Sequence, residues 1–335
     1  MTASQNELLR ANSRSFYLTL RVLPAAIRSQ IGLAYLLART ADTIADTEIV
    51  PIAQRLDALQ KFRERILDKS AAQVNFSDFV GRRGAPEEKL LLEKAGESLD
   101  GMQKFSESDQ KLIRTVLVTI ISGQELDLKR FAPKESTHMQ VVALESPRDL
   151  DDYTYRVAGC VGEFWSKLCR AHLFPNVRMD ESQFMINAVR FGKGLQLVNI
   201  LRDVPADYKK GRCYLPIEKL EQAKLSPQTM LSEIHEQKFL PFFHEYLDKA
   251  EDHLRAGWEY TNTLPFSQFR LRLACAWPIL IGMKTIEKLR RARLIDLKQN
   301  LKVARPEVKR IMVCSLLASP IRPVWAKLLP QKQLH

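Results

Sequence analysis

The sequence predicts an all-α protein, and three observations support this fold class. Glycine is scarce, at 13 of 335 residues, whereas proteins built from sheets and tight turns use it freely. The 16 prolines leave two long stretches, 52–85 and 87–132, uninterrupted, which favours long helices. Apolar residues recur at helical spacing, and no Asn-Gly or Asp-Gly turn joins two alternating apolar runs.

The predicted helices follow one another along the whole chain. Residues 27–46 carry an apolar stripe that includes Ile31 and Leu37, and Pro24 precedes them, as is common near a helix start. We expect helices over residues 27–46, 52–69, 87–105, 107–130, 150–171, 181–204, 229–262, 268–295 and 305–317. The segments expected to be loops are 70–86, 131–148, 208–228 and 296–304. Because no clear linker separates these helices, we expect a single domain over residues 1–335.

The net charge suggests which kinds of partner the protein binds, and the cysteine content suggests where in the cell it is located. The net charge of +12 suggests an anionic partner, which could be nucleic acid, a phosphorylated small molecule or an anionic membrane surface. The five cysteines are an odd number and form no Cys-x-x-Cys pair, so we expect reduced thiols and a cytoplasmic location. The N-terminus has no apolar signal segment, and the longest apolar run, Leu273–Met283, is too short to span a bilayer. We therefore expect a soluble protein or one that is peripheral at the membrane.

The first candidate site lies near the end of the helix predicted over 27–46. Asp42 and Asp46 are four residues apart, so a helix places both carboxylates on one face, where they repel each other. Mg²⁺ would relieve this repulsion, since it takes one or two protein carboxylates together with substrate phosphate oxygens. Arg39, one turn earlier on the same face, could hold a phosphate. A solvated acidic helix end is the alternative, and it is the commoner origin of an isolated Asp-x-x-x-Asp pair.

The same pattern returns at Asp203 and Asp207, where an apolar predicted helix ends. Arg202 stands beside this second pair, and three basic residues follow within 209–212, so carboxylates for a metal are followed by cations for phosphate. Pro205 removes one helical hydrogen bond between the two aspartates. A kink or an end of the helix is expected there, which would move Asp207 away from the position above Asp203.

Two further segments carry polar side chains that a site could use. Tyr153 opens the segment 153–162, in which the small residues Gly159 and Gly162 would let a helix or a ligand approach closely; close helix packing is the alternative. The segment Ser13–Phe16 offers hydroxyl groups and a cation, and a local turn or cap is the alternative there.

Taken together, these segments resemble the squalene/phytoene synthase family, the head-to-head trans-isoprenyl diphosphate synthases. The matching segments, in the order of the family, are Ser13–Phe16, Tyr35–Asp46, Tyr153–Gly162 and Gly194–Pro216. The resemblance runs from about residue 10 to residue 220 and less clearly to about residue 315. It implies a single isoprenoid synthase domain, with helices around a deep central cavity, and a Mg²⁺-dependent prenyltransferase.

The resemblance also implies a role for each matching residue. The residues that would bind Mg²⁺ are Asp42, Asp46, Asp203 and Asp207, which would thereby act in catalysis, and Asn199 on the metal or cofactor side. The residues that would contact the substrate are Ser13, Arg14, Tyr35, Arg39, Arg202 and Arg212. Tyr153 would handle a proton near the departing diphosphate. Family motifs often carry a third acid before the last aspartate, and Ala45 and Ala206 stand at those places here.

The implied reaction joins two molecules of farnesyl diphosphate to presqualene diphosphate, which is then ionised and rearranged. Hydride from NADPH would give squalene, proton loss would give dehydrosqualene or, from C20 substrates, phytoene, and water would give hydroxysqualene. Cys275–Met283 resembles the apolar Cys-Ala-x-Pro stretch of squalene synthases, and Lys302–Arg305 resembles their basic flap. Squalene is therefore the predicted product, with Asn199, Lys302 and Arg305 on the NADPH side. A proline-kinked core helix and a solvated basic loop are the alternatives, and no Gly-x-Gly-x-x-Gly motif predicts a Rossmann unit.

Other functions compete with this one. A non-catalytic helical protein that binds nucleic acid would cluster basic residues with aromatic ones, whereas here arginines stand beside paired aspartates, so we expect no nucleic-acid partner. A head-to-tail prenyltransferase or a terpene cyclase gives no reason for the segments Tyr153–Gly162 and Arg212–Pro216. Eukaryotic squalene synthases usually end in a membrane anchor, and we expect a chain most like one without it, with peripheral contact to an anionic membrane.

Overall fold

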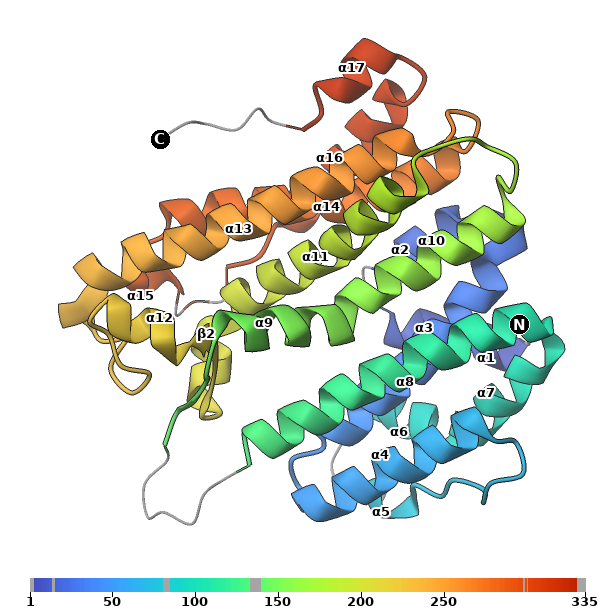
Figure 1. Ribbon diagram of the computed structural model, residues 1–335, viewed down its shortest axis with the longest axis horizontal. Helices are drawn as coiled ribbons and strands as arrows, with labels where there is room; N and C mark the ends of the chain where they lie inside the picture. Colours follow the sequence, from blue (N-terminus) through green and yellow to red (C-terminus); the bar gives the residue numbers. More distant parts are fainter. Residues whose placement is uncertain are drawn as a thin grey trace. The chain divides into compact units, whose positions relative to one another are not determined.

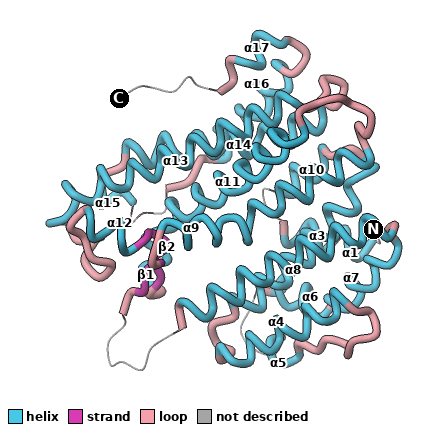
Figure 2. The backbone as a smooth tube through the Cα atoms, in the orientation of Figure 1, coloured by secondary structure: helices cyan, strands magenta, loops and turns pink. Residues whose placement is uncertain are grey.

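Nearly every element of the protein is a helix, as the sequence predicts (Figures 1 and 2). The structure is a computed structural model that describes residues 3–13, 16–80, 85–132, 140–297, 299 and 301–329. The chain divides into two compact units, one formed by residues 1–132 and 163–176, the other by residues 133–162 and 177–335. Within the described ranges, no helix is both long and apolar enough to cross a bilayer.

The first unit is built on helix α3 (Ala25–Asp46), which packs against α4 (Ile52–Leu67) and α8 (Glu107–Arg130). The apolar stripe predicted for residues 27–46 is the buried face of α3, where Ile31 and Leu37 are almost completely buried. The remaining elements of this unit are α1 (Ala3–Asn12), α2 (Phe16–Val22), α5 (Ser77–Val80), α6 (Pro86–Glu93), α7 (Ala95–Gly101), η1 (Met102–Lys104) and the part of α10 (Cys160–His172) that follows Gly162.

The second unit centres on three long helices that pack together, α11 (Glu181–Lys209), α13 (Glu236–Thr263) and α14 (Phe269–Arg291). They run side by side in Figure 1. Its other elements are β1 (Val142–Leu144), α9 (Pro147–Thr154), the π-helical turn η2 (Tyr155–Gly159), β2 (Arg212–Pro216), α12 (Ile217–Gln222), η3 (Glu233–His235), α15 (Leu294–Leu297), α16 (Arg305–Ala318) and α17 (Arg322–Ala326).

Glycine makes possible a close helix contact in the second unit. A Cβ atom on Gly162 would lie 2.0 Å from the backbone oxygen of Ala188, and one on Gly192 would lie 2.2 Å from that of Ala158. Real Cβ atoms essentially never come so close, so η2 and the start of α10 can cross α11 only because these residues lack a side chain. The small residues predicted to allow close packing in 153–162 therefore do so, and η2 lies at this crossing.

The structure corrects several predicted boundaries. The helix predicted over 87–105 is split at Lys94 into α6 and α7, with Gly96, a weak helix former, just beyond the break. The helix predicted over 229–262 begins only at Glu236, after a turn and a short 3₁₀ segment. The helix predicted over 268–295 ends at Arg291.

Two segments predicted as loops contain paired strands. β1 and β2 form a two-stranded parallel sheet, with Val142 opposite Arg212 and a register shift after Ala143 (Figure 2). The backbone N–H of Val142 donates to the carbonyl of Gly211, whose φ of 74° lies in the left-handed region that glycine adopts without strain. The residue pattern along the chain did not predict this pairing, because the two strands are short and far apart in the sequence.

Candidate active site

The first aspartate pair lies on the last turns of α3, within the first unit. The side-chain amide of Gln124, on α8, donates a hydrogen bond to Oδ1 of Asp42. Withdrawal from bulk water and the negative charge of Asp46 raise the pKa of the Asp42 carboxyl from 3.8 to about 7, while the positive charge of Arg39 acts in the opposite direction. A divalent cation would relieve the repulsion between these carboxylates, so the pair fits Mg²⁺.

Arg39 has two carboxylate neighbours. Its Nη2 lies 3.0 Å from Oε1 of Glu88, on α6, and its Nη1 lies 4.0 Å from Oδ2 of Asp42. Arg39, Asp46 and Glu88 line one cavity of about 250 Å³, together with Lys89. A diphosphate entering this cavity would find a guanidinium that an ion pair already orients.

Three other residues of this unit, Ser13, Arg14 and Tyr35, were predicted to contact the substrate. The hydroxyl of Tyr35 donates to the backbone carbonyl of Asn12 at 3.0 Å. Ser13 is 2% exposed, and its hydroxyl donates to the carbonyl of Leu9, so it caps the end of α1. Arg14 lies outside the described residues.

The second aspartate pair lies on α11, and the helix continues past Pro205 to Lys209. The expected end of the helix at Pro205 is therefore wrong. A proline removes only one hydrogen bond of the ladder, and packing against α13 and α14 supports the rest of this buried helix. Asp203 and Asp207 are thus four residues apart on one continuous helix, which places them on one face.

Arg202 pairs with the aspartate that follows it. Its Nε and Nη2 donate to the two carboxylate oxygens of Asp203 at 2.9 and 2.6 Å. The hydrogen bond from Arg202 to Asp203 and the charges of Asp203 and Asp207 raise the pKa of the Arg202 guanidinium above its usual value, against the effect of burial. Asn199 lies one turn before Asp203 on the same helix and is exposed.

Strand β2 brings a second group of predicted residues to α11. Asp207, Arg212 and Tyr214 line one small internal space. Tyr214 is stacked on Tyr153, with ring centroids 4.8 Å apart and an angle of 25° between the ring planes, and their hydroxyl oxygens are 3.5 Å apart. Burial raises the pKa of the Cys213 thiol to about 12, so this neighbour is not a nucleophile.

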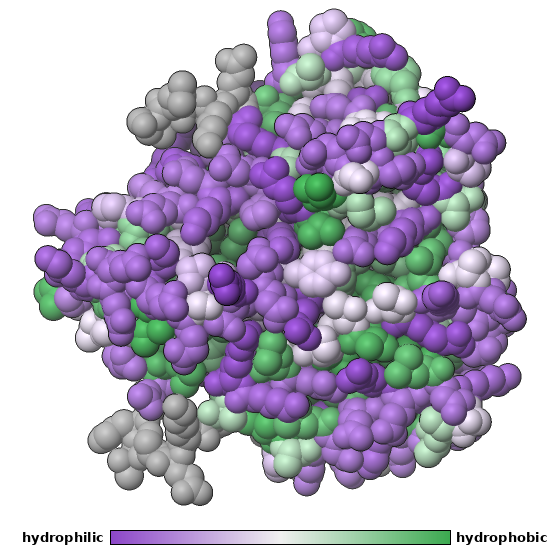
Figure 3. All heavy atoms as spheres, viewed as in Figure 1, coloured by the Kyte–Doolittle hydropathy of each residue, from purple (hydrophilic) through white to green (hydrophobic). Residues whose placement is uncertain are grey.

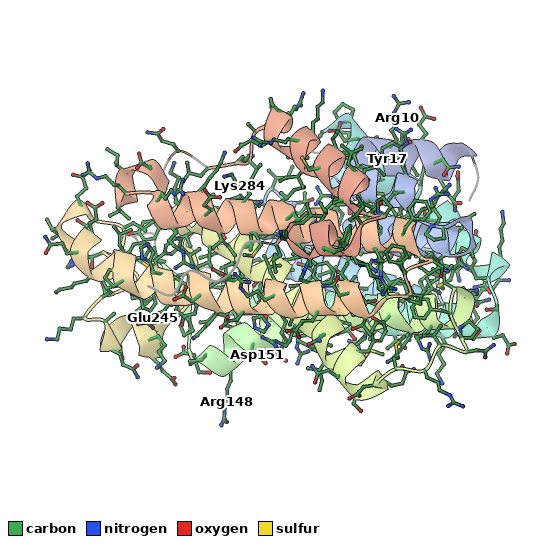
Figure 4. The ribbon with its side chains drawn as sticks, turned by 90° about the horizontal axis from the view of Figure 1, so that it is seen from above. Arg10, Tyr17, Arg148, Asp151, Glu245 and Lys284 are labelled. Atoms are coloured by element: carbon green, nitrogen blue, oxygen red, sulfur yellow. The ribbon has the colours of Figure 1, made fainter. Side chains whose placement is uncertain are left out.

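Helix α9 has an inner and an outer face that explain the position of Tyr153. Tyr153 is 8% exposed, whereas Arg148 and Asp151 point outward from the same helix (Figure 4). The helix starts in a capping box, in which the Ser146 hydroxyl accepts from the N–H of Asp149 and the Asp149 carboxylate accepts from the N–H of Ser146. This fixed start sets the face on which Tyr153 lies.

The residues predicted on the NADPH side lie on α11 and just before or at the start of α16. Lys302 and Arg305 are exposed, and the carbonyl of Lys302 accepts from Nζ of Lys288 at 3.3 Å. No hydrogen bond or ion pair joins either of them to Asn199 in the described part of the chain. The described residues contain no group of three or more Asp, Glu, His or Cys side chains with metal-site geometry.

Three residues with contacts to the predicted site were not predicted. Glu88 and Gln124 come from helices far along the chain from Asp42, and neither stands in a motif of its own. Tyr214 lies in the segment Arg212–Pro216, which the resemblance included, so the signal for it was present in the sequence.

Known proteins share this fold. A solved complex described as TcSQS with a ligand has a TM-score of 0.77 and 23% identity, covering 97% of this chain and 90% of that one. The protein thus has the all-α isoprenoid synthase fold. The family model for squalene/phytoene synthase matches residues 9–308, and the chain belongs to this family, whose members are head-to-head prenyltransferases that use a divalent metal such as Mg²⁺.

Curated relatives differ in what they are named for. The presqualene diphosphate synthase of Zymomonas mobilis is 32% identical over 222 residues, which cover 66% of this chain and 62% of that protein. A bifunctional lycopene cyclase/phytoene synthase of Podospora anserina is 28% identical over 229 residues, covering 67% of this chain. The match spans only 36% of that relative's length.

Proposed function

We propose that this protein is a squalene synthase, which condenses two farnesyl diphosphates to presqualene diphosphate and reduces the rearranged product with NADPH. The main support is that each unit carries an Asp-x-x-x-Asp pair on a helix with an arginine beside it. We also propose that the two units together make up one synthase domain. The resemblance of Cys275–Met283 and Lys302–Arg305 to squalene synthase segments favours squalene over the other products.

In this proposal, residues of the protein stabilise the charge of the diphosphate and hold a proton near it. Arg39, Arg202 and Arg212 balance the charge of the departing diphosphate, because guanidinium groups match phosphate oxygens in geometry and charge. Mg²⁺ held by the aspartate pairs would neutralise the negative charge that develops when the allylic bond ionises. Tyr153, stacked on Tyr214, holds the proton that the diphosphate side requires. Asn199, Lys302 and Arg305 are the proposed contacts of NADPH.

A second candidate is the same condensation without reduction. Relatives named for presqualene diphosphate synthase and phytoene synthase support it. Its product would be dehydrosqualene, hydroxysqualene, phytoene or presqualene diphosphate itself.

Product analysis tests both candidates. The purified protein is incubated with farnesyl diphosphate and Mg²⁺, with and without NADPH, and the extract is read by mass spectrometry. Squalene that forms only with NADPH is the expected result. Any other C30 product that forms regardless of NADPH would establish the second candidate, and geranylgeranyl diphosphate in a parallel reaction tests the C40 route to phytoene.

We further propose that the surface formed by α16 and α17, here called the α16–α17 face, contacts an anionic membrane. Its exposed apolar residues, with exposed fractions of 46–69%, are Val313, Leu316, Leu317, Ile321 and Val324. Apolar and strongly hydrophilic residues lie side by side over α17 in Figure 3. Residues 305–329 contain five basic side chains, whereas Glu307 is their only acid and pairs with Lys288. Two such cationic faces would repel each other, so an anionic lipid surface fits better than a second copy.

The exposed Cys314 offers a probe on this face, since the other four cysteines are buried. Labelled at Cys314 with an environment-sensitive fluorophore, the protein should show a blue shift on vesicles that contain phosphatidylglycerol and little change on phosphatidylcholine alone. Added salt or a Leu316→Glu, Leu317→Glu double variant should reduce the shift. A shift that depends on protein concentration without lipid would instead indicate self-association and overturn the membrane assignment.

A further inference from the structure

Glu88 is a charged residue at the first aspartate pair that no motif includes. It approaches from α6, and its Oε1 lies 3.0 Å from Nη2 of Arg39, whereas the nearest oxygen of Asp42 is 4.0 Å from Nη1. The guanidinium of Arg39 therefore favours Glu88 over the aspartate on its own helix. Glu88 and Asp46 line the same cavity as Arg39, so this ion pair lies at the site and not on a remote surface.

The two oxygens of Asp42 differ in what surrounds them. Oδ1 accepts a hydrogen bond from Gln124, and Oδ2 is the oxygen that faces Arg39 across 4.0 Å. An arginine three residues before an aspartate on a helix can reach it to form a direct ion pair. If Arg39 closed this gap, its guanidinium would occupy the oxygen that Gln124 leaves available for a cation.

We propose that Glu88 is a positioning residue that holds Arg39 away from Asp42, so that Asp42 keeps an oxygen for Mg²⁺ and Arg39 faces the diphosphate. Glu88 does this from a neighbouring helix at a site where Ala45 supplies no third acid. It acts through Arg39, because its carboxylate forms an ion pair with that guanidinium at 3.0 Å. This inference rests on the proposed function, because it assumes that Asp42 carries Mg²⁺.

The test is the Mg²⁺ concentration that half-saturates binding of inorganic pyrophosphate, measured by isothermal titration calorimetry on the whole protein. Glu88→Ala should raise this concentration about 3- to 10-fold, a modest factor because the Arg39 and Glu88 side chains are 26% and 34% exposed. Glu88→Gln, which keeps a hydrogen-bond acceptor, should shift it less in the same direction. In product assays, saturating Mg²⁺ should restore kcat in Glu88→Ala.

Glu87→Ala is the matched control, because it removes the same charge from the neighbouring, exposed position of α6. In an Arg39→Gln background, Glu88→Ala should cause no further change, since the residue through which it acts is gone. Equal half-saturating concentrations in Glu88→Ala and Glu87→Ala would overturn the inference while leaving the proposed function intact. A wild-type protein without Mg²⁺-dependent pyrophosphate binding would overturn both.

Discussion

Two buried tyrosines of the second unit, Tyr153 and Tyr260, have similar surroundings but different expected roles. Tyr153 and Tyr260 are both buried and both stacked on another ring, Tyr153 on Tyr214 and Tyr260 on Phe184. Only Tyr153 lies beside the strand that carries Arg212. Tyr153→Phe should therefore lower kcat about 100-fold with KM nearly unchanged, because a positioned acid or base contributes at least that factor.

Tyr260→Phe is the control for this prediction and should leave kcat at the wild-type value. Product formation is measured by mass spectrometry at saturating substrate. Equal rates for Tyr153→Phe and Tyr260→Phe would remove Tyr153 from the proton-handling role.

His253 makes stability depend on pH. Burial first, and then the charges of Arg190 and Lys193 on α11, lower the pKa of the His253 imidazole from 6.5 to about 4, while Asp151 on α9 and Asp252 on α13 act in the opposite direction. Between pH 4 and pH 6.5 the His253 imidazole is therefore protonated in the unfolded chain but neutral in the folded protein. The full shift corresponds to roughly 3 kcal/mol, and solvent screening of the partly buried ring reduces it. The free energy of unfolding should therefore fall by about 1–2 kcal/mol as the pH drops from 6.5 to 4.

Urea unfolding at pH 7, 5.5 and 4.5 measures this effect, and His253→Gln isolates it. The stability of the variant should decline less with falling pH than that of the wild type, because carboxylates elsewhere contribute equally to both. Parallel pH profiles would mean that another group causes the decline.

At the scale of elements, the crossing of η2 and α10 with α11 depends on glycine. Gly162→Ala and Gly192→Ala each place a Cβ within 2.2 Å of a backbone carbonyl oxygen, which neither helix can move aside cheaply. Each should lower the free energy of unfolding by about 3 kcal/mol in urea titrations. Gly96→Ala on α7 is the matched control, since its Cβ meets nothing within 4 Å, and it should be neutral or slightly stabilising.

The sequence predicts an element correctly where neighbouring residues in the chain determine it. The start and end of α8 were predicted correctly, because the Ser106 cap and an uninterrupted periodic segment define it. The π-helical turn and the continuation of α11 through Pro205 were not, because both depend on helices packed against them. The same holds for the pairing of β1 with β2.

At the scale of the whole molecule, the fold class and the family could be predicted from the sequence because several weak motifs occur in one order. Asp42, Asp46, Asp203 and Asp207 lie at helix positions that the spacing alone defines. The partners of these residues, such as Glu88 and Gln124, could not be predicted, because they approach from other helices. The exposed apolar residues of the α16–α17 face likewise required knowledge of which side of α16 is covered, as Ser315 is by Trp277.

The short parallel pairing of β1 with β2 also limits which insertions and deletions the chain can tolerate just before β2. Val142 is paired with Arg212 and Ala143 with Cys213, and neighbouring residues of a strand point to opposite faces. One codon inserted between those for Lys209 and Arg212 would put the Arg212 guanidinium where the Cys213 thiol now lies and would turn Tyr214 away from Tyr153. Insertions and deletions in this stretch should therefore be far less tolerated than point substitutions of Lys209 or Lys210, which are exposed.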